Sequence, residues 1–233
     1  MGVGVSVFFT AKAAKGSAKS ARQSAKKGRP ITPIDPVKPV PPITPEPAPQ
    51  SPIPKKITMP QDQSTQFKDL FLSEIRRRLF DESWPRVERC LGELEEEEIW
   101  YRPNAHSNSV GNLILHLCGN ARQWIVSGLG GAPDHRRRSE EFAEQGPISL
   151  PQLQHQLRIL AGDIQDVLDR LTVEDLLREY TVQGFRETGI SMLLHVVEHF
   201  SYHVGQITYF VKARKDIDLK YYTGHNLEQT NQG

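Results

Sequence analysis

Apolar residues recur at steps of three and four along the chain beyond residue 60, which is the spacing of one face of an α-helix. This pattern predicts four long helices: about 62–91 with a kink at Pro85, about 110–127, from Ser149-Leu150-Pro151 to about 171, and about 188–214. Long amphipathic helices with shorter connections favour an antiparallel bundle. We therefore predict an all-α fold, an antiparallel four-helix bundle.

The segments between these helices are polar or contain glycine. Gly92 and the acidic run 93–98 end the first helix, and the second ends at the glycines that begin with Gly128. The polar stretch that follows is predicted to be a loop, and its run Arg136-Arg137-Arg138 is predicted to be solvated. Residues 178–187 are predicted to be extended, as a short hairpin or an irregular crossover.

Residues 1–60 differ from the rest of the chain in composition. They hold ten Lys/Arg and two Asp/Glu, and twelve of the seventeen prolines lie between Pro30 and Pro60. Such a segment buries too little apolar surface to offset its conformational entropy. We predict a disordered, basic and Pro-rich tail over 1–60, a folded domain over 61–215, and a flexible C-terminal segment over 216–233.

The role of this tail stays open. It is either dispensable, or an organellar address, or a basic arm for an anionic surface; in a further alternative, translation begins at Met59. A Lys/Ala tail predicts only salt-sensitive attraction, so no specific nucleic-acid partner is expected. The net charge of +1 is the sum of +8 over 1–60 and −7 over 61–233.

Other features exclude several classes of protein. The chain has no run of 18 apolar residues, so no transmembrane segment is predicted. Cys90 and Cys118, without a secretion signal, predict free thiols and a cytoplasmic location. No glycine-rich phosphate-binding motif is present.

Two histidines of the last predicted helix share a face. His199 and His203 are four residues apart, which places their Cβ atoms about 5–6 Å from each other. Two imidazoles at this spacing can reach one cation at about 2.0–2.1 Å. Gln206 continues the same stripe.

A third histidine lies on the second predicted helix. His116 is the centre of a polar strip with Asn112 and Asn120, inside an otherwise apolar helix. Buried polar groups cost free energy unless they are satisfied, so this strip requires a partner. If the two helices face each other, His116 supplies a third imidazole; the alternative is that all three are hydrogen-bonded core histidines.

Three neutral imidazoles with an open fourth position form a Lewis-acid site. Zn²⁺ is favoured, and Ni²⁺ or iron are alternatives, because the ligand type alone does not select the metal. The residues that could orient the ligands or a bound molecule are Gln206, Asn112, Asn120, Glu198 and Tyr202.

A competing motif overlaps this site. His195-Val-Val-Glu198-His199 matches H-x-x-E-H, a zinc-peptidase signature with two ligands and a glutamate base. That reading also requires a distant carboxylate ligand and a substrate cleft.

Two blocks of sequence resemble a known family. Ser109-Val-Gly-Asn-Leu-Ile-Leu-His116-Leu-Cys-Gly-Asn-Ala-Arg-Gln-Trp124 and Leu194-His195-Val-Val-Glu-His199-Phe-Ser-Tyr-His203-Val-Gly-Gln206-Ile are similar to the DinB-like (YfiT-like) superfamily of four-helix bundles. The resemblance covers about 62–214, and the family's three metal histidines fall on His116, His199 and His203.

The resemblance implies a divalent metal, often zinc or nickel, and a homodimer. Some members are transferases that use a low-molecular-weight thiol, and many have no assigned reaction. The hypotheses are therefore a metal- and thiol-dependent transferase acting on a small electrophile, or a metal-dependent hydrolase. A non-catalytic, metal-binding dimer in stress response is the alternative, and the zinc peptidase is a further one; no catalytic residue is assigned.

Overall fold

The computed structural model describes residues 61–231, so the predicted tail over 1–60 lies outside the described residues. Within this range the chain is mostly helical and has one two-stranded sheet. The elements are α1 (Gln61–Arg76), the π-helical η1 (Arg77–Ser83), α2 (Trp84–Leu91), α3 (Glu96–Ile99), α4 (Val110–Ala121), the π-helical η2 (Arg122–Leu129), α5 (Arg138–Ala143), α6 (Leu150–Arg170), α7 (Val173–Leu177), β1 (Glu179–Val182), β2 (Phe185–Thr188) and α8 (Gly189–Lys215).

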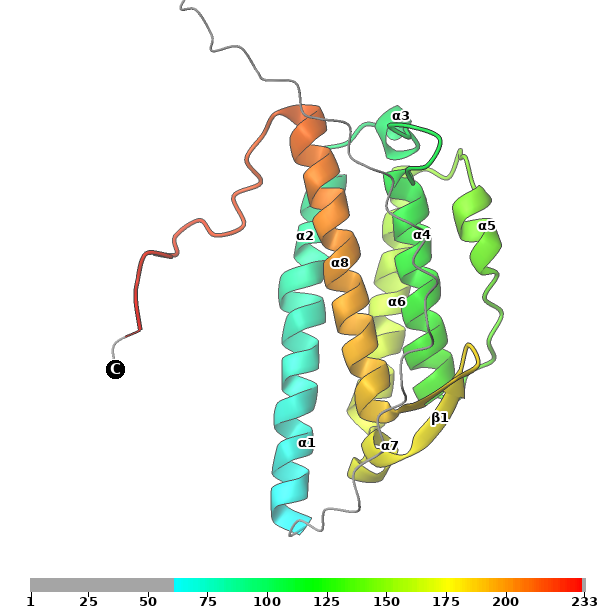
Figure 1. Ribbon diagram of the computed structural model, residues 1–233, viewed down its shortest axis with the longest axis vertical. Helices are drawn as coiled ribbons and strands as arrows, with labels where there is room; N and C mark the ends of the chain where they lie inside the picture. Colours follow the sequence, from blue (N-terminus) through cyan, green and yellow to red (C-terminus); the bar gives the residue numbers. More distant parts are fainter. Residues whose placement is uncertain (1–60, 232–233) are drawn as a thin grey trace, which may run out of the picture. The chain divides into compact units, whose positions relative to one another are not determined.

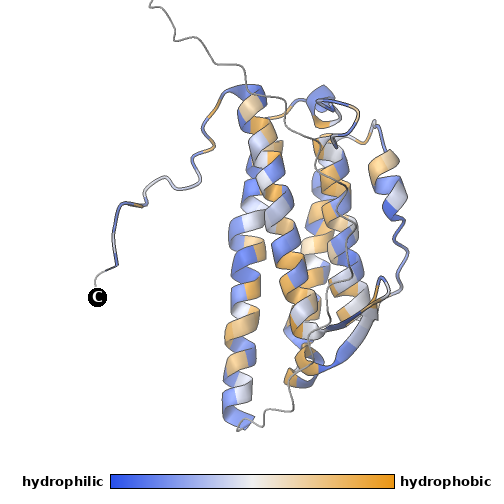
Figure 2. Cartoon of the chain, in the orientation of Figure 1, coloured by the Kyte–Doolittle hydropathy of each residue, from blue (hydrophilic) through white to orange (hydrophobic). Residues whose placement is uncertain are grey.

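The long helices form where the apolar periodicity predicts them. They pack side by side: α4 contacts both α6 and α8, and α2 contacts α8 (Figure 1). One fully or almost fully buried apolar residue from each stretch shows where the core lies: Leu79, Leu117, Leu160 and Phe200 are at most 1% exposed. Apolar and polar residues alternate around the long helices (Figure 2); α6 and α8 expose one face to solvent, whereas α4 has no exposed residue.

Local signals in the sequence set the ends of several helices. Ser109 caps α4, because its side-chain oxygen accepts a hydrogen bond from the backbone N–H of Asn112. Thr188 caps α8 in the same way. A π-helical stretch ends at Ser83, two residues before Pro85, where the kink is predicted, and α1, η1 and α2 follow one another without a break.

The prediction of an all-α fold is wrong in one place. Residues 179–188 form an antiparallel hairpin in which Val182 pairs with Phe185. Gln183 and Gly184 form its turn, and both have positive φ angles, as the type I′ hairpin turn requires. The extended structure predicted for residues 178–187 is confirmed, and it is the short hairpin and not the irregular crossover. The hairpin packs against η2 through β1.

Two predicted connections contain further structure. The predicted polar loop after η2 contains α5, which packs on α4 (Figure 1). The predicted flexible segment 216–233 begins with a docked stretch, since Leu219 is 4% exposed and the hydroxyl of Tyr221 lies 3.1 Å from Sγ of Cys90.

Cys90 and Cys118 are both free thiols, as predicted. None of the described helices is long and apolar enough to span a bilayer.

Candidate metal centre

Three histidines from two helices meet at one point. His116 comes from α4, and His199 and His203 come from α8; their ligating nitrogens all lie within 4.8 Å of one another. The Nε2 atoms of His116 and His199 are 3.0 Å apart. Helix packing therefore brings together the three histidines that the sequence singled out.

This spacing suits a metal ion. Two nitrogens bound to one zinc at about 2.0–2.1 Å with tetrahedral angles are about 3.3–3.4 Å apart. The ring centroid of His203 lies 5.1 Å from the ring centroid of His116 and 4.5 Å from that of His199. The three rings can therefore share one ion after only small movements. The donor set, three imidazoles, fits zinc, nickel, copper or iron.

His116 is held by a buried carboxylate. Its Nδ1 lies 2.8 Å from Oε2 of Glu141, and the two side chains are 6% and 9% exposed. Glu141 is on α5, so this short helix reaches the site on α4. A carboxylate on Nδ1 keeps the proton on that nitrogen and leaves the lone pair of Nε2 free for a metal.

Arg136 in turn holds Glu141. Its Nε donates to Oε1 of Glu141 at 2.7 Å and its Nη2 donates to Oε2 at 3.0 Å. The side chain of Arg136 is only 4% exposed, so the prediction that it is solvated is wrong. A buried charge requires a partner, and this pair supplies one in bidentate geometry. Burial raises the pKa of Glu141, but hydrogen bonds from His116 and Arg136 outweigh it and hold that pKa below its usual value.

Gly119 makes room for this ion pair on the surface of α4. A Cβ added there would lie 2.8 Å from Cδ of Glu141 and 3.1 Å from Nε of Arg136. Both distances are shorter than ordinary packing contacts, so the carboxylate approaches α4 closely because this position has no side chain.

The two histidines of α8 differ in their partners. Nδ1 of His203 lies 2.8 Å from Oε1 of Gln206, so Gln206 accepts its N–H and Nε2 is left for a ligand role. Nδ1 of His199 is buried and has no hydrogen-bond partner among the described residues. Burial, together with the neighbouring histidines, lowers the pKa of His199 to about 3, and burial lowers the pKa of His203 as well. Both rings are therefore neutral near pH 7, as metal binding requires.

A second layer of polar and aromatic side chains lies next to the three histidines. The ring of His195 stacks on Trp124, with centroids 3.8 Å apart, and its Nε2 lies 3.3 Å from Nδ2 of Asn120. Trp124 donates its indole N–H to Oε1 of Gln183 at 3.3 Å, which ties the hairpin turn to this layer.

The peptidase motif is not assembled as a metal site. The group of potential ligands contains His199 but not His195, and Glu198 is exposed to solvent. In that motif both histidines bind the ion and the glutamate faces the substrate. The geometry therefore gives this alternative no support.

The remaining candidates contact the site indirectly. Asn112 donates to the backbone carbonyls of Glu141 and Glu144 at 2.9 and 2.8 Å, so it fastens α5 to α4 and does not touch a histidine ring. Tyr202 is 63% exposed, and its ring meets the edge of His203 at a centroid distance of 5.0 Å.

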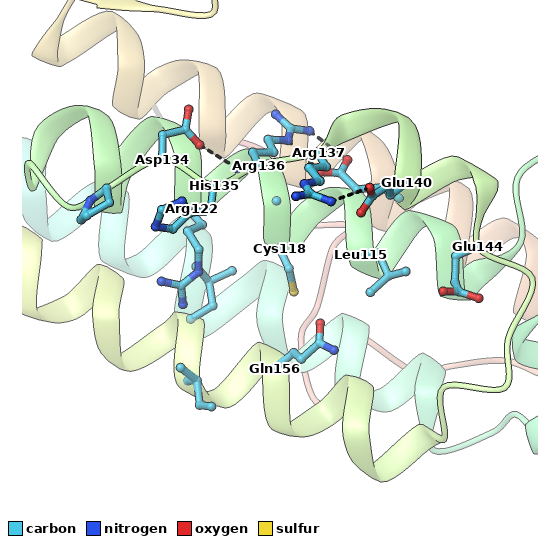
Figure 3. A pocket seen from close by; sticks show the side chains of 15 residues that line it. Leu115, Cys118, Arg122, Asp134, His135, Arg136, Arg137, Glu140, Glu144 and Gln156 are labelled. Carbon is cyan, nitrogen blue, oxygen red and sulfur yellow. Dashed lines mark hydrogen bonds and ion pairs between the residues drawn. The ribbon is translucent and has the colours of Figure 1, made fainter.

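A cleft of about 710 Å³ adjoins the Arg136–Glu141 pair. Leu115 and Cys118 of α4 and Gln156 of α6 are among the residues that line it, and the charged segment before and within α5 forms a large part of its wall (Figure 3). Burial raises the pKa of the Cys118 thiol to about 12, so this group remains a thiol. The three histidines do not line this cleft.

The comparisons with known proteins place the chain in a family. A model described as "Protein of unknown function (DUF1572)" matches residues 66–224. The chain belongs to this family. No curated protein matches the DUF1572 chain.

A solved structure shares the fold of this DUF1572 protein. It is described as the crystal structure of the conserved protein of locus from Enterococcus faecalis. The two chains are 18% identical, the TM-score is 0.50, and the match covers 66% of this chain and 98% of the other. At this identity the likeness concerns the fold alone.

Sequence reasoning missed Arg136, Glu141 and Gly119. No periodicity marks the first two, because Arg136 lies in an irregular segment and α5 is only six residues long. The one available signal was the isolated glycine: a glycine within a helical pattern often has a packing reason.

Proposed function

We propose that this protein binds one divalent transition-metal ion through Nε2 of His116, His199 and His203. Zn²⁺ is the favoured ion, and Ni²⁺ or iron are the alternatives, because neutral imidazoles suit all three. One observation carries the proposal: three imidazoles from two helices converge, two of them buried and that of His199 half-buried, and partners on Nδ1 turn two of them inward. Core histidines without a metal would not need three nitrogens directed at one point.

The resemblance to the DinB-like superfamily supports the same set of ligands. It also supports the interpretation that the long helices form an antiparallel four-helix bundle. A homodimer, a cytoplasmic location and a role in stress response stay predictions of the sequence.

We infer that the centre activates a small nucleophile toward a small-molecule electrophile or a hydrolysable substrate. A bound divalent ion supplies Lewis acidity, which lowers the pKa of a water or thiol ligand. Glu141 keeps the proton on Nδ1 of His116, Arg136 keeps Glu141 ionised, and Gln206 orients His203.

The chain's own cysteines do not supply the thiol. Cys90 is fully buried, and burial raises its pKa, as it does for Cys118. Neither belongs to the group of ligating side chains. A thiol-dependent reaction would therefore use a low-molecular-weight thiol from solution.

Metal content tests this proposal. The purified chain, loaded with Zn²⁺ and dialysed, is expected to hold one ion per chain by elemental analysis. His116→Ala, His199→Ala and His203→Ala are each expected to lose it, whereas His195→Ala is the matched control and keeps it. Retention in His203→Ala with loss in His195→Ala would instead favour the peptidase motif.

Turnover is tested separately. The zinc-loaded chain is incubated with a low-molecular-weight thiol and monobromobimane, and thiol consumption is compared between wild type and His116→Ala. Faster consumption by the wild type alone supports a transferase. Equal rates support a metal-binding protein without this activity.

A further inference from the structure

His199 is the one histidine of the centre whose outer nitrogen has no partner. Its Nε2 lies 3.0 Å from Nε2 of His116 and faces the centre. When Nε2 binds a metal, the proton of a neutral imidazole is on Nδ1. That N–H is buried without an acceptor among the described residues, which costs free energy.

Asn120 carries the complementary unpaired atom. Its Oδ1 is buried and has no donor, and the residue is 4% exposed. Among the buried side-chain nitrogens and oxygens of residues 61–231, only these two atoms, Oδ1 of Asn120 and Nδ1 of His199, have no partner. One is an acceptor, and the other is a donor in the tautomer that binds a metal.

Asn120 and His199 lie on two helices that pack against each other, α4 and α8. Asn120 follows His116 by one turn on α4, and its Nδ2 lies 3.3 Å from Nε2 of His195. His195 precedes His199 by one turn on α8, and their ring centroids are 5.6 Å apart. Asn120 therefore lies against the part of α8 from which His199 enters the centre.

We propose that Asn120 is the positioning residue of His199: its Oδ1 accepts the Nδ1–H, either after rotation of the amide or through one ordered water. This inference rests on the proposed metal site. It gives each ligand a partner of its own, Glu141 for His116, Asn120 for His199 and Gln206 for His203. The bond fixes the tautomer that directs the lone pair of Nε2 at the ion.

The test compares two substitutions of different chemistry. Asn120→Leu keeps the approximate shape but removes the acceptor, and Asn120→Asp keeps an acceptor and adds charge. Zinc affinity is measured by competition with a chelator. The leucine variant is expected to bind zinc about 10–100-fold more weakly, and the aspartate variant at least as tightly as wild type.

A second readout reports the bond itself. In the zinc-loaded, ¹⁵N-labelled protein, the Nδ1–H of His199 is expected to give a slowly exchanging imidazole resonance. The resonance should persist in Asn120→Asp and disappear in Asn120→Leu. A purely structural role of Asn120 would not be restored by the aspartate.

His195→Phe is the matched control, because it removes the contact that Asn120 makes in the structure and leaves Asn120 in place. It should keep zinc affinity within about twofold of the wild type, since the changed group binds no metal. The inference is overturned if Asn120→Leu binds zinc like the wild type, if Asn120→Asp binds it more weakly, or if His195→Phe reproduces the loss. A wild-type chain that binds no zinc overturns the proposed function, and this inference with it.

Discussion

Gly119→Ala is expected to weaken metal binding although alanine is the better helix former. Gly119 lies inside α4, where the change alone would stabilise the helix by about 1 kcal/mol. The new methyl group would lie 2.8 Å from Cδ of Glu141 and closer still to its Oε1. The carboxylate must therefore move.

The cost follows from what holds that carboxylate. Glu141 is bonded to His116 at 2.8 Å and to Arg136 at 2.7 and 3.0 Å. A hydrogen bond to a charged group contributes about 1.5–3 kcal/mol, so the loss of one outweighs the gain in helix propensity. The expected net effect is a loss of about 0.5–2 kcal/mol in the free energy of unfolding. His116 also loses its partner, which lowers metal affinity by about 10–100-fold.

Gly162→Ala provides the matched control. Gly162 lies in α6, and a Cβ there meets nothing within 4 Å. This variant should gain about 0.5–1 kcal/mol and keep its zinc affinity. Urea unfolding of the metal-free proteins and chelator competition measure the two quantities. The reasoning is refuted if Gly119→Ala is stabilised as much as Gly162→Ala and binds zinc equally well.

Three further predictions concern charge, pH and the C-terminal segment. Glu141→Gln should lower the free energy of unfolding by about 3 kcal/mol, since it leaves a buried arginine without its counter-ion, and an unchanged urea midpoint would contradict this. The metal-free protein should lose stability as the pH falls below about 6.5. The pKa of His199 is lowered from 6.5 in the unfolded chain to about 3 in the folded protein, so between these values only the unfolded chain binds the proton. Thermal unfolding from pH 8 to pH 4 tests this, and a melting temperature that does not change with pH would contradict it. Leu219→Ala should cost about 2–4 kcal/mol because Leu219 is 4% exposed, whereas Leu227→Ala, at 66% exposure, should cost close to none; equal melting temperatures would exclude a docked segment.

The long helices are predictable from the sequence because their buried apolar residues recur at a fixed spacing. In α6, Leu153, Leu157, Leu160 and Ile164 are all buried, at the steps of three and four that predict one apolar face. The extended character of the hairpin is predictable from the sequence, but its place against η2 is not, and α5 shows no such periodicity. Their positions depend on tertiary contacts such as Trp124 with Gln183, which no local pattern encodes.

The same distinction applies to the site. His199 and His203 are predictable because residues four apart on a helix share a face. His116 is predictable only as a polar residue that requires a partner on another helix. The pair of Arg136 and Glu141 is not predictable, because a charged residue in an irregular segment is usually solvated and only the packing of α5 on α4 buries this one.

The central claim is tested most directly by X-ray absorption at the zinc edge of the loaded protein. Three imidazole nitrogens at about 2.0–2.1 Å, together with one or two oxygen ligands such as water, are expected, and the dialysed His116→Ala variant should keep no zinc and give no zinc edge. A spectrum with sulfur ligands, or one that is identical in the wild type and in this variant, would show that the ion is bound elsewhere and that the three histidines form no metal centre.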